Sequence, residues 1–348
     1  MHELWFCLVV VMFTVYAVMD GFDFGAGVLH LFVAKRDEER REVLGAIGPF
    51  WAGNEVWLLA GGGALFLAFP RVLAAGFSGF YLAMFLVVWV LILRGLSIEF
   101  RSHVRGELWR AFWDLSFAVA SFALPILLGA AVGNLLRGVP LDASGFFNLP
   151  LFTDFSARNP VGILDWYSVL PGVVGLAAAA GLGALSLAWR TQGGGQARSR
   201  ALARPLWAVV AGLWAIATLA TWIVNPALLA GFSGSFPAWL LALVFLAGLA
   251  TVFLGLARER PLTAFLGSGA FILGLLGASA ACAWPVMLKS TLDPALSLTA
   301  RNAGAGIHAL RAGLAWWVLG FPLAAGYVAL LFRIHRGKIR VAPEDEGY

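Results

Sequence analysis

Two carboxylates, Asp20 and Asp23, lie inside an apolar stretch of the chain that is long enough to cross a membrane. They are three residues apart, so in a helix they share one face. An ionised carboxylate near the bilayer centre costs about 2.5 to 3.5 kcal/mol on insertion scales, and such residues usually belong to a proton or ion path. The alternative is structural, with each carboxyl group neutral, hydrogen-bonded to the backbone or to Asn54, and serving only to join helices.

A second polar pair, Asn54 and Glu55, lies in the apolar stretch 48–70, GPFWAGNEVWLLAGGGALFLAFP. Trp51 precedes this pair by one helical turn and shares its face. Trp51 and Trp57 bracket Glu55, which singles them out because most of the 15 Trp residues lie near span ends, where Trp is common. The stretch therefore predicts a membrane helix with a carboxylate near its middle.

The third apolar stretch carries Arg94 and Glu99 in its inner part, and the fourth begins with Asp114. An unpaired arginine inside the membrane would be costly, so we expect Arg94 to form an ion pair with one of the acids. The predicted proton route consists of Asp20, Asp23, Asn54, Glu55 and Glu99. Trp51, Trp57, Arg94 and Asp114 are expected to support it by packing or by ion pairs.

Composition indicates a polytopic membrane protein. Hydrophobic residues make up 61% of the 348 residues, charged residues 12%, and the mean hydropathy is +0.85. A soluble protein has about twice this charged fraction. Runs of about 20 apolar residues, the length that crosses a bilayer as a helix, predict nine spans. These are 3–33, 43–69, 72–98, 110–136, 162–189, 203–228, 236–257, 261–288 and 308–333.

The basic residues predict the orientation. With the N-terminus outside, the inner loops and tail hold 17 of the 24 Lys and Arg residues, as the positive-inside rule requires. The outer loops hold Arg71, Arg137, Arg158, Lys289, Arg301 and Arg311. The predicted fold is all-α, a single integral membrane domain over 1–348. It has nine transmembrane helices in two four-helix bundles plus one extra helix, a linker at 191–204, and a cytoplasmic C-terminus.

Several function classes are disfavoured. The high pI of about 9.6 follows from the inner loops, and no basic run with interleaved aromatics indicates nucleic-acid binding. No metal-ligand cluster, phosphate-binding loop or nucleophile triad stands out. The five His residues lie near span ends or at the terminus, which argues against a haem bound by this chain's own histidines.

A set of motifs resembles subunit II of the cytochrome bd-type quinol oxidases, the family that includes the cyanide-insensitive oxidases. The motifs lie along nearly the whole chain and are densest in its first 140 residues. They are GFDFGAG at 21–27, GPFWAGNEVWL at 48–58, GGALFLAFP at 62–70, SGFYLAM at 78–84, the RG…EFRS stretch at 94–102, the stretch at 109–114, GNLLRGVP at 133–140 and WPVMLKS at 284–290.

The resemblance implies a subunit of a terminal oxidase that is not catalytic alone, in a bacterial plasma (inner) membrane. In this family, subunit I binds haems b and d and oxidises quinol with O2, while subunit II binds no haem, packs against subunit I and helps to provide a cytoplasmic proton route. Some members hold a structural quinone in subunit II, and a small single-helix accessory subunit is common. Membrane lipid would surround the complex.

One position departs from the family pattern. The family often has an acid directly after the motif Trp, in the sequence W-D-G-N, and that acid belongs to the proposed proton route. Here the position is Ala52. The route would then rely on the remaining acids and water, or protons would reach the haems through subunit I.

Two other functions are compatible with the same residues. A stand-alone proton-coupled transporter would use the acids and Arg94 to line a substrate cavity, although the inverted repeat typical of many transporters is not evident. A purely structural scaffold would have every acid paired and none exchanging protons. Association with a haem-bearing subunit would separate the oxidase subunit from the transporter.

Overall fold

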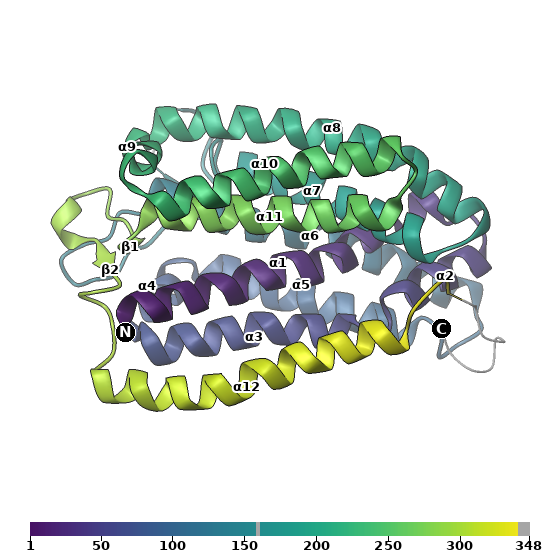
Figure 1. Cartoon of the computed structure of the whole chain (residues 1–348), viewed down its shortest axis with the longest axis horizontal. Helices are drawn as coiled ribbons and strands as arrows, with labels where there is room; N and C mark the ends of the chain where they lie inside the picture. The colour runs from purple at the N-terminus through teal and green to yellow at the C-terminus, as the bar shows by residue number, and fades with distance from the viewer. Residues whose placement is uncertain (158–160, 340–348) are drawn as a thin grey trace.

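The computed structural model describes residues 1–157 and 161–339, and it is a bundle of long helices that run roughly parallel or antiparallel (Figure 1). Arg158 and the last residues of the tail, which carried part of the predicted charge distribution, lie outside the described residues. The long helices are α1 (His2–Val33), α3 (Trp51–Ala68), α5 (Tyr81–Phe100), α6 (Glu107–Arg137), α7 (Val169–Arg190), α8 (Gly193–Val224), α10 (Phe236–Ala257), α11 (Pro261–Ala283) and α12 (Ile307–Ile334).

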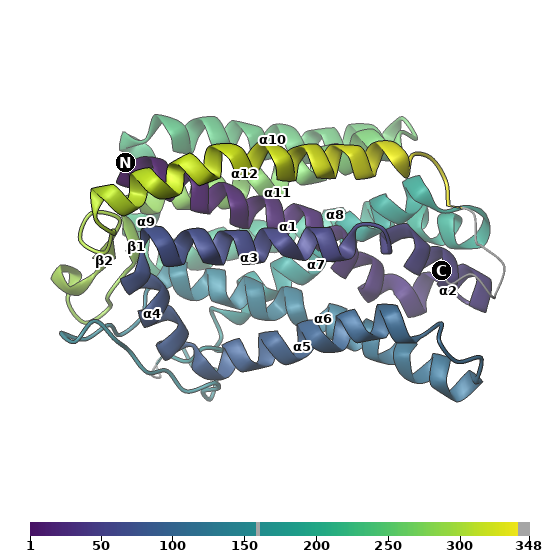
Figure 2. The same cartoon turned by 90° about the horizontal axis from the view of Figure 1, so that it is seen from below.

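Short elements cover both ends of the bundle. The end with α2 (Asp37–Ile47) also holds the last described residues, while the N-terminus and α4 (Pro70–Gly79) lie at the opposite end (Figures 1 and 2). That opposite end also carries α9 (Pro226–Ala230), the 3-10 turns η1 (Gly231–Gly234) and η2 (Pro294–Leu296), and an antiparallel pair, β1 (Val286–Leu288) with β2 (Leu298–Thr299). The prediction of an all-α chain therefore misses one small strand pair.

The described residues contain eight helices that are long and apolar enough to cross a membrane, or nine if the bent pair α3–α4 counts as one span. The 236–257 span has the bounds of α10, and the other spans overlap helices. The prediction of many membrane-length helices is confirmed. Their division into two bundles, their exact number and their orientation stay predictions.

The predicted second and third spans have wrong boundaries. Residues 43–47 belong to α2, and the helix axis bends by 119° between α3 and α4. The cause is Pro70, which pushes the preceding residue out of the helical region and is itself well suited to the first turn of a new helix. Phe69 accordingly has φ −138° and ψ 59°. A second break at Phe80 ends α4, so α5 begins at Tyr81 rather than at 72.

Three further boundaries differ. The predicted linker at 191–204 is helical, because α8 begins at Gly193 and continues through a segment rich in Ala, Gln, Arg and Leu, which are strong helix formers. The eighth span ends at Ala283 instead of 288, where Trp284 and Pro285 lead into β1. The fifth begins at Val169, since residues 162–168 form a turn around Asp165.

Helix α1 lies within the bundle and positions the acids, in contact with α3, α6, α7 and α11. Its closest neighbour is α7, where Gly25 faces Gly183. A Cβ atom on Gly25 would lie 1.8 Å from the Ala179 carbonyl oxygen, so only glycine permits this approach. At the other extreme, α12 packs on α3 with only Leu310 fully buried.

Candidate functional site: a buried carboxylate cluster

The expected ion pair of Arg94 is a cluster of three carboxylates around one guanidinium. Arg94 of α5 donates from Nη2 to Asp20 in a short contact and from Nη1 to Glu55 Oε1 at 2.7 Å. Asp23 Oδ2 lies 3.5 Å from Nη2. Three helices that the sequence separates by up to 74 residues therefore meet at one cation.

Asn54 completes the cluster from α3. Its Nδ2 donates to Asp23 Oδ2 at 2.8 Å and to the Met19 carbonyl oxygen at 3.0 Å. The sequence-based suggestion that an acid of α1 is hydrogen-bonded to Asn54 is confirmed for Asp23. Because Asn54 is one turn into α3, its side chain reaches α1 where the GFDFGAG motif passes it.

Aromatic side chains enclose the guanidinium. Arg94 lies over the Phe24 ring at 5.0 Å and over the Trp51 ring at 5.7 Å, which are favourable cation–π distances. Trp57, two residues after Glu55 in the chain, is buried. Its ring packs edge-on against Phe321 of α12. The two tryptophans thus have different roles, since Trp51 contacts the charged group and Trp57 fixes the packing of α3.

The members of the cluster differ in how much of their surface is exposed. Asp20, Asp23 and Arg94 have no accessible surface, whereas the Glu55 side chain is 28% exposed. If all three carboxylates were ionised, the site would carry two uncompensated negative charges away from water. Buried charges without partners are strongly disfavoured, so the arrangement favours bound protons on the carboxyl groups. The cluster can therefore hold and release protons, with Glu55 as its accessible member.

Glu99 lies outside this cluster. It is exposed, one residue before the C-terminal end of α5, and its backbone carbonyl accepts a hydrogen bond from His103. The sequence placed it on the route because it follows Arg94 in the same stretch. Five residues along a helix, however, correspond to an angle of about 140° away from the face that Arg94 uses.

Asp114 belongs to a second ionic network near the α2 end of the bundle. It accepts from Arg101 Nε at 2.5 Å and from Arg40 Nη1 at 2.8 Å, and its Oδ1 lies 2.6 Å from His30 Nε2. Arg101 also donates to Asp37 at 2.6 Å, and Asp37 pairs with Arg110 at 3.1 Å. Asp114 therefore forms ion pairs with Arg40 and Arg101, and its role in supporting a proton route stays a prediction.

Sequence reasoning missed His30 because it regarded this residue only as a histidine near a span end. It is fully buried and joins α1 to α6. The available signal was its spacing, since Tyr16, Asp20, Asp23 and His30 recur at intervals of three, four and seven on one face of α1. Tyr16 is buried there beside Asp20.

An ion pair at the opposite end of the bundle joins α6 to a neighbouring turn. Arg137, at the end of α6, contacts Asp165 and Asn134 in short hydrogen bonds and donates to the Gly162 carbonyl oxygen at 3.1 Å. Burial alone would raise the pKa of Asp165, but the backbone N–H of Ser168 and the Arg137 guanidinium outweigh it and hold that pKa below its usual range. This pair joins α6 to the turn before α7.

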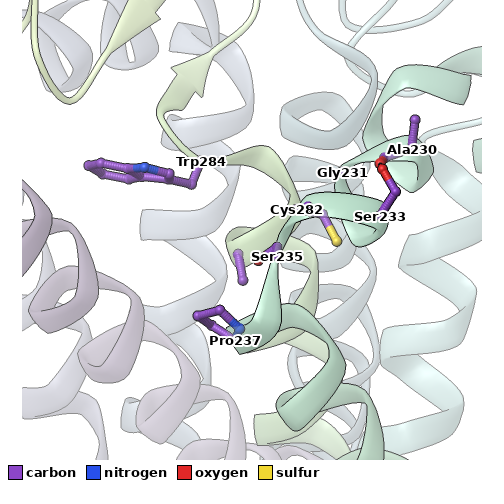
Figure 3. Close-up of a pocket in the computed structure, with 9 residues that line it drawn as sticks. Ala230, Gly231, Ser233, Ser235, Pro237, Cys282 and Trp284 are labelled. Atoms are coloured by element: carbon purple, nitrogen blue, oxygen red, sulfur yellow. The ribbon is translucent and has the colours of Figure 1, made fainter.

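A cavity of about 490 Å³ lies at the same end of the bundle as Arg137 and is separate from the carboxylate cluster. Its lining comes from η1, from the start of α10 and from the end of α11, including Ser233, Ser235, Cys282 and Trp284 (Figure 3). None of the acids or cations described above lines it. The acid chemistry of the chain is therefore found in the packed helix interior.

Comparisons with known proteins agree with the motifs. The model of the family described as cytochrome bd terminal oxidase subunit II matches residues 1–335. The chain belongs to this family. Cytochrome bd ubiquinol oxidase subunit 2 of Bacillus subtilis is 33% identical over 314 residues, which cover 89% of this chain and 88% of that protein.

Two other similarities extend the comparison. Cytochrome bd-I ubiquinol oxidase subunit 2 of Escherichia coli K12 is 38% identical over 228 residues, or 64% of this chain, and the match spans 59% of that relative's length. A chain in the structure of bd oxidase from Geobacillus thermodenitrificans superimposes with a TM-score of 0.75 at 18% identity, covering 96% of this chain and 98% of that one. The fold is therefore the one found in a bd oxidase.

Proposed function

We propose that this chain is the haem-free subunit of a bd-type quinol:O2 oxidoreductase in a bacterial plasma membrane. It stabilises a haem-bearing subunit I and carries protons from the cytoplasm toward the site of O2 reduction. Family membership supports the oxidase assignment. The single observation that supports proton transfer is the buried cluster of three carboxylates around Arg94, which favours bound protons and opens to the outside through Glu55.

The packing of the cluster favours protons over a larger substrate. A transporter would need space beside its charged residues, whereas Asp20, Asp23 and Arg94 have no exposed surface. Proton transfer needs only short hydrogen-bonded steps between groups that can gain and lose a proton. Each of the three carboxyl groups meets that requirement, and Arg94 keeps them within reach of one another.

The same geometry suggests where subunit I would pack. Glu55 and Leu59 are one turn apart on the outward side of α3, and Leu59 is 73% exposed. A partly exposed carboxylate directed at lipid would be unfavourable, but the same group covered by a polar protein surface would be stable. We therefore place the haem-bearing subunit against this side of α3.

The haems fit the partner better than this chain. Haem iron needs an axial side chain such as His, Met or Cys beside a space for the macrocycle. The one fully buried histidine in the described residues, His30, is bonded to Asp114 and packed against the Phe117 ring at 5.4 Å. Haems b and d would then lie in subunit I, where quinol is oxidised, and a structural quinone or a single-helix accessory subunit stays a prediction from the family.

The proposal is tested in the assembled oxidase with Glu55→Gln and Asp20→Asn. Removing one proton-binding group should slow O2 consumption with quinol by about tenfold or more, because a positioned acid or base commonly contributes at least that much. The haem spectrum should stay unchanged, and Glu55→Asp should recover part of the rate. Normal turnover and proton uptake in both neutral variants would exclude the route, and isolation of a competent chain without a haem-bearing partner would exclude the oxidase assignment.

A further inference from the structure

A row of small and polar residues continues from the carboxylate cluster toward the α2 end of the bundle. Asp20, Asp23, Gly27 and His30 are spaced by three, four and three, so they lie on one face of α1. All four are buried. This face connects the carboxylate cluster with the ionic network around Asp114.

His30 has a free ring nitrogen inside the protein. Its Nε2 lies 2.6 Å from Asp114 Oδ1, while its Nδ1 has no hydrogen-bond partner among the described residues. Arg40 and Arg101 hold Asp114 in place from the other side. A buried nitrogen without a partner is unfavourable, and such groups commonly have a catalytic or water-binding role.

Ser121 of α6 fills the position between His30 and Asp23. A Cβ atom on Gly27 would lie 1.9 Å from the Ser121 Oγ, so the hydroxyl occupies the space that a side chain at residue 27 would take. Ser121 has no exposed surface, and its Oγ has no hydrogen-bond partner in the described part of the chain. The glycine of the motif therefore admits a hydroxyl to the polar face of α1.

Asp23 has a carboxyl oxygen without a donor at the other end. Its Oδ2 accepts from Asn54 and lies near Arg94, while its Oδ1 accepts from no donor among residues 1–157 and 161–339. The neighbouring Asp20 carboxyl group lies within hydrogen-bond range of Asp23, so the two can share a proton. The rise of an α-helix puts His30 and Gly27 about 4.5 Å apart along the axis, and Gly27 and Asp23 about 6 Å apart. Each step matches one hydroxyl or one bridging water.

We propose that His30 and Ser121 form the cytoplasmic half of the proton route and deliver protons to Asp23. This inference rests on the proposed function and adds its missing connection to the inner side. The N–H bond at His30 Nδ1 breaks as an O–H bond forms on the Ser121 hydroxyl or an adjoining water, which passes its own proton on to Asp23 Oδ1. The neutral imidazole keeps its Nε2–H, which donates to the Asp114 carboxylate, and a proton carried in by water from the cytoplasm forms a new N–H bond at Nδ1 and restores the imidazolium.

Water can reach this region through the ionic network. The side chain of Asp37 is 37% exposed and that of Arg40 is 30% exposed, while Asp114 and His30 are buried behind them. Asp114 orients the imidazole and favours its cationic form, while burial and the neighbouring Arg101 and Arg40 guanidinium groups oppose that form. His30 is thus a proton-exchanging residue and Asp114 a positioning residue.

Ser121→Ala in the assembled oxidase is the direct test. It removes one oxygen and no charge, so the fold should persist. We expect O2 consumption to fall by about tenfold, equivalent to about 1.4 kcal/mol in the barrier, and the solvent deuterium isotope effect on turnover to increase. The matched control is Ser268→Ala on α11, which is equally buried but bonded to its own helix at the Phe265 carbonyl. That variant should turn over normally.

His30→Gln is the second test. A glutamine amide can reach the position of Nε2 and donate to Asp114, but it offers no group at Nδ1 and does not bind a proton near neutral pH. Slow turnover with a normal haem spectrum and a raised isotope effect is expected. Loss of haem, or slow turnover in only one of the two variants, would overturn the relay. Normal turnover in both, with Glu55→Gln still slow, would overturn it while leaving the proposed function standing, and normal turnover in all three would overturn both.

Discussion

The carboxylate cluster and the ionic network around Asp114 contain the same kinds of side chain. The ratio of carboxylates to arginines is reversed between them. The cluster has three carboxylates on one cation, Arg94. The network around Asp114 has two carboxylates, Asp37 and Asp114. They pair with three arginines, Arg40, Arg101 and Arg110. In the first region protons must supply the missing positive charge, whereas in the second the arginines already exceed the acids.

The difference indicates which network is suited to which task. Arginine does not lose its proton in proteins, so a network with excess arginine keeps its carboxylates ionised and its geometry fixed. A network with excess carboxylate changes its proton content whenever a neighbouring charge changes. The ionic network around Asp114 therefore joins α2, α5 and α6 to α1, and the carboxylate cluster has the composition suited to proton exchange.

The largest expected effect is that of removing Arg94. Arg94→Met would leave three buried carboxylates without a cation, which should destabilise the subunit by about 3 to 5 kcal/mol. Arg101→Met should have a smaller effect, because Asp114 keeps Arg40 and Asp37 keeps Arg110. The measurement is the amount of haem-containing complex recovered from membranes and its melting temperature. Equal losses in the two variants would contradict the comparison.

Neutralising one acid should change the melting temperature in opposite directions in the two regions. Asp114→Asn strands buried arginines and should lower the melting temperature, with a cost of about 3 kcal/mol or more. Asp23→Asn reduces an excess of negative charge and keeps an oxygen for Asn54, so the melting temperature should stay the same or rise even though turnover falls. Thermal unfolding of the two purified variant complexes checks this. A lower melting temperature for Asp23→Asn would show that the cluster does not carry an excess of negative charge.

Much of the fold could be predicted because apolar length is a strong signal for membrane helices. The breaks at Phe69 and Phe80 were missed, since the residues on both sides are equally apolar and only Pro70 marks one of them. The helical start of α8 was missed because glycine and arginine at a predicted loop indicated a linker. In each case the composition was identified correctly and the position of a turn was not.

The site was predictable in part for the same reason. An unpaired Arg94 inside a membrane would be energetically unfavourable. Its pairing with an acid could therefore be predicted from this free-energy cost alone. Which acids it reaches depends on helix rotation, which the sequence does not give. The sequence therefore could not show that Glu99 lies outside the contacts of Arg94, or that His30 contacts Asp114. The polar periodicity of α1 was present in the sequence, but its meaning depends on Ser121, which comes from another helix.

A smaller effect concerns how α2 is attached. Burial raises the pKa of Glu39, but hydrogen bonds from Arg198 and from the backbone N–H groups of Lys35 and Arg36 prevail and lower that pKa to about 2. A carboxylate whose pKa is lower in the folded state adds stability above its unfolded pKa of about 4.3 and loses it as the pH falls toward 2. The melting temperature of the complex should therefore fall less steeply between pH 5 and pH 3 for Glu39→Gln than for the unmodified chain. Parallel pH profiles would contradict this assignment.

The smallest expected effect is that of Glu99→Gln, and it sets the boundary of the proton-exchanging region. Glu99 lies on the same helix as Arg94 and near the same end of the bundle, but it is exposed and outside the contacts of the cluster. An exposed carboxylate exchanges its proton directly with water. Solvent can therefore supply the proton when this carboxylate is removed. Turnover with quinol and O2 should stay within about twofold of the unmodified enzyme, since surface substitutions rarely change energies by more than about 0.5 kcal/mol. A tenfold loss measured beside Glu55→Gln would mean that protons are collected at Glu99, and the route would then begin at the end of α5 rather than at the polar face of α1.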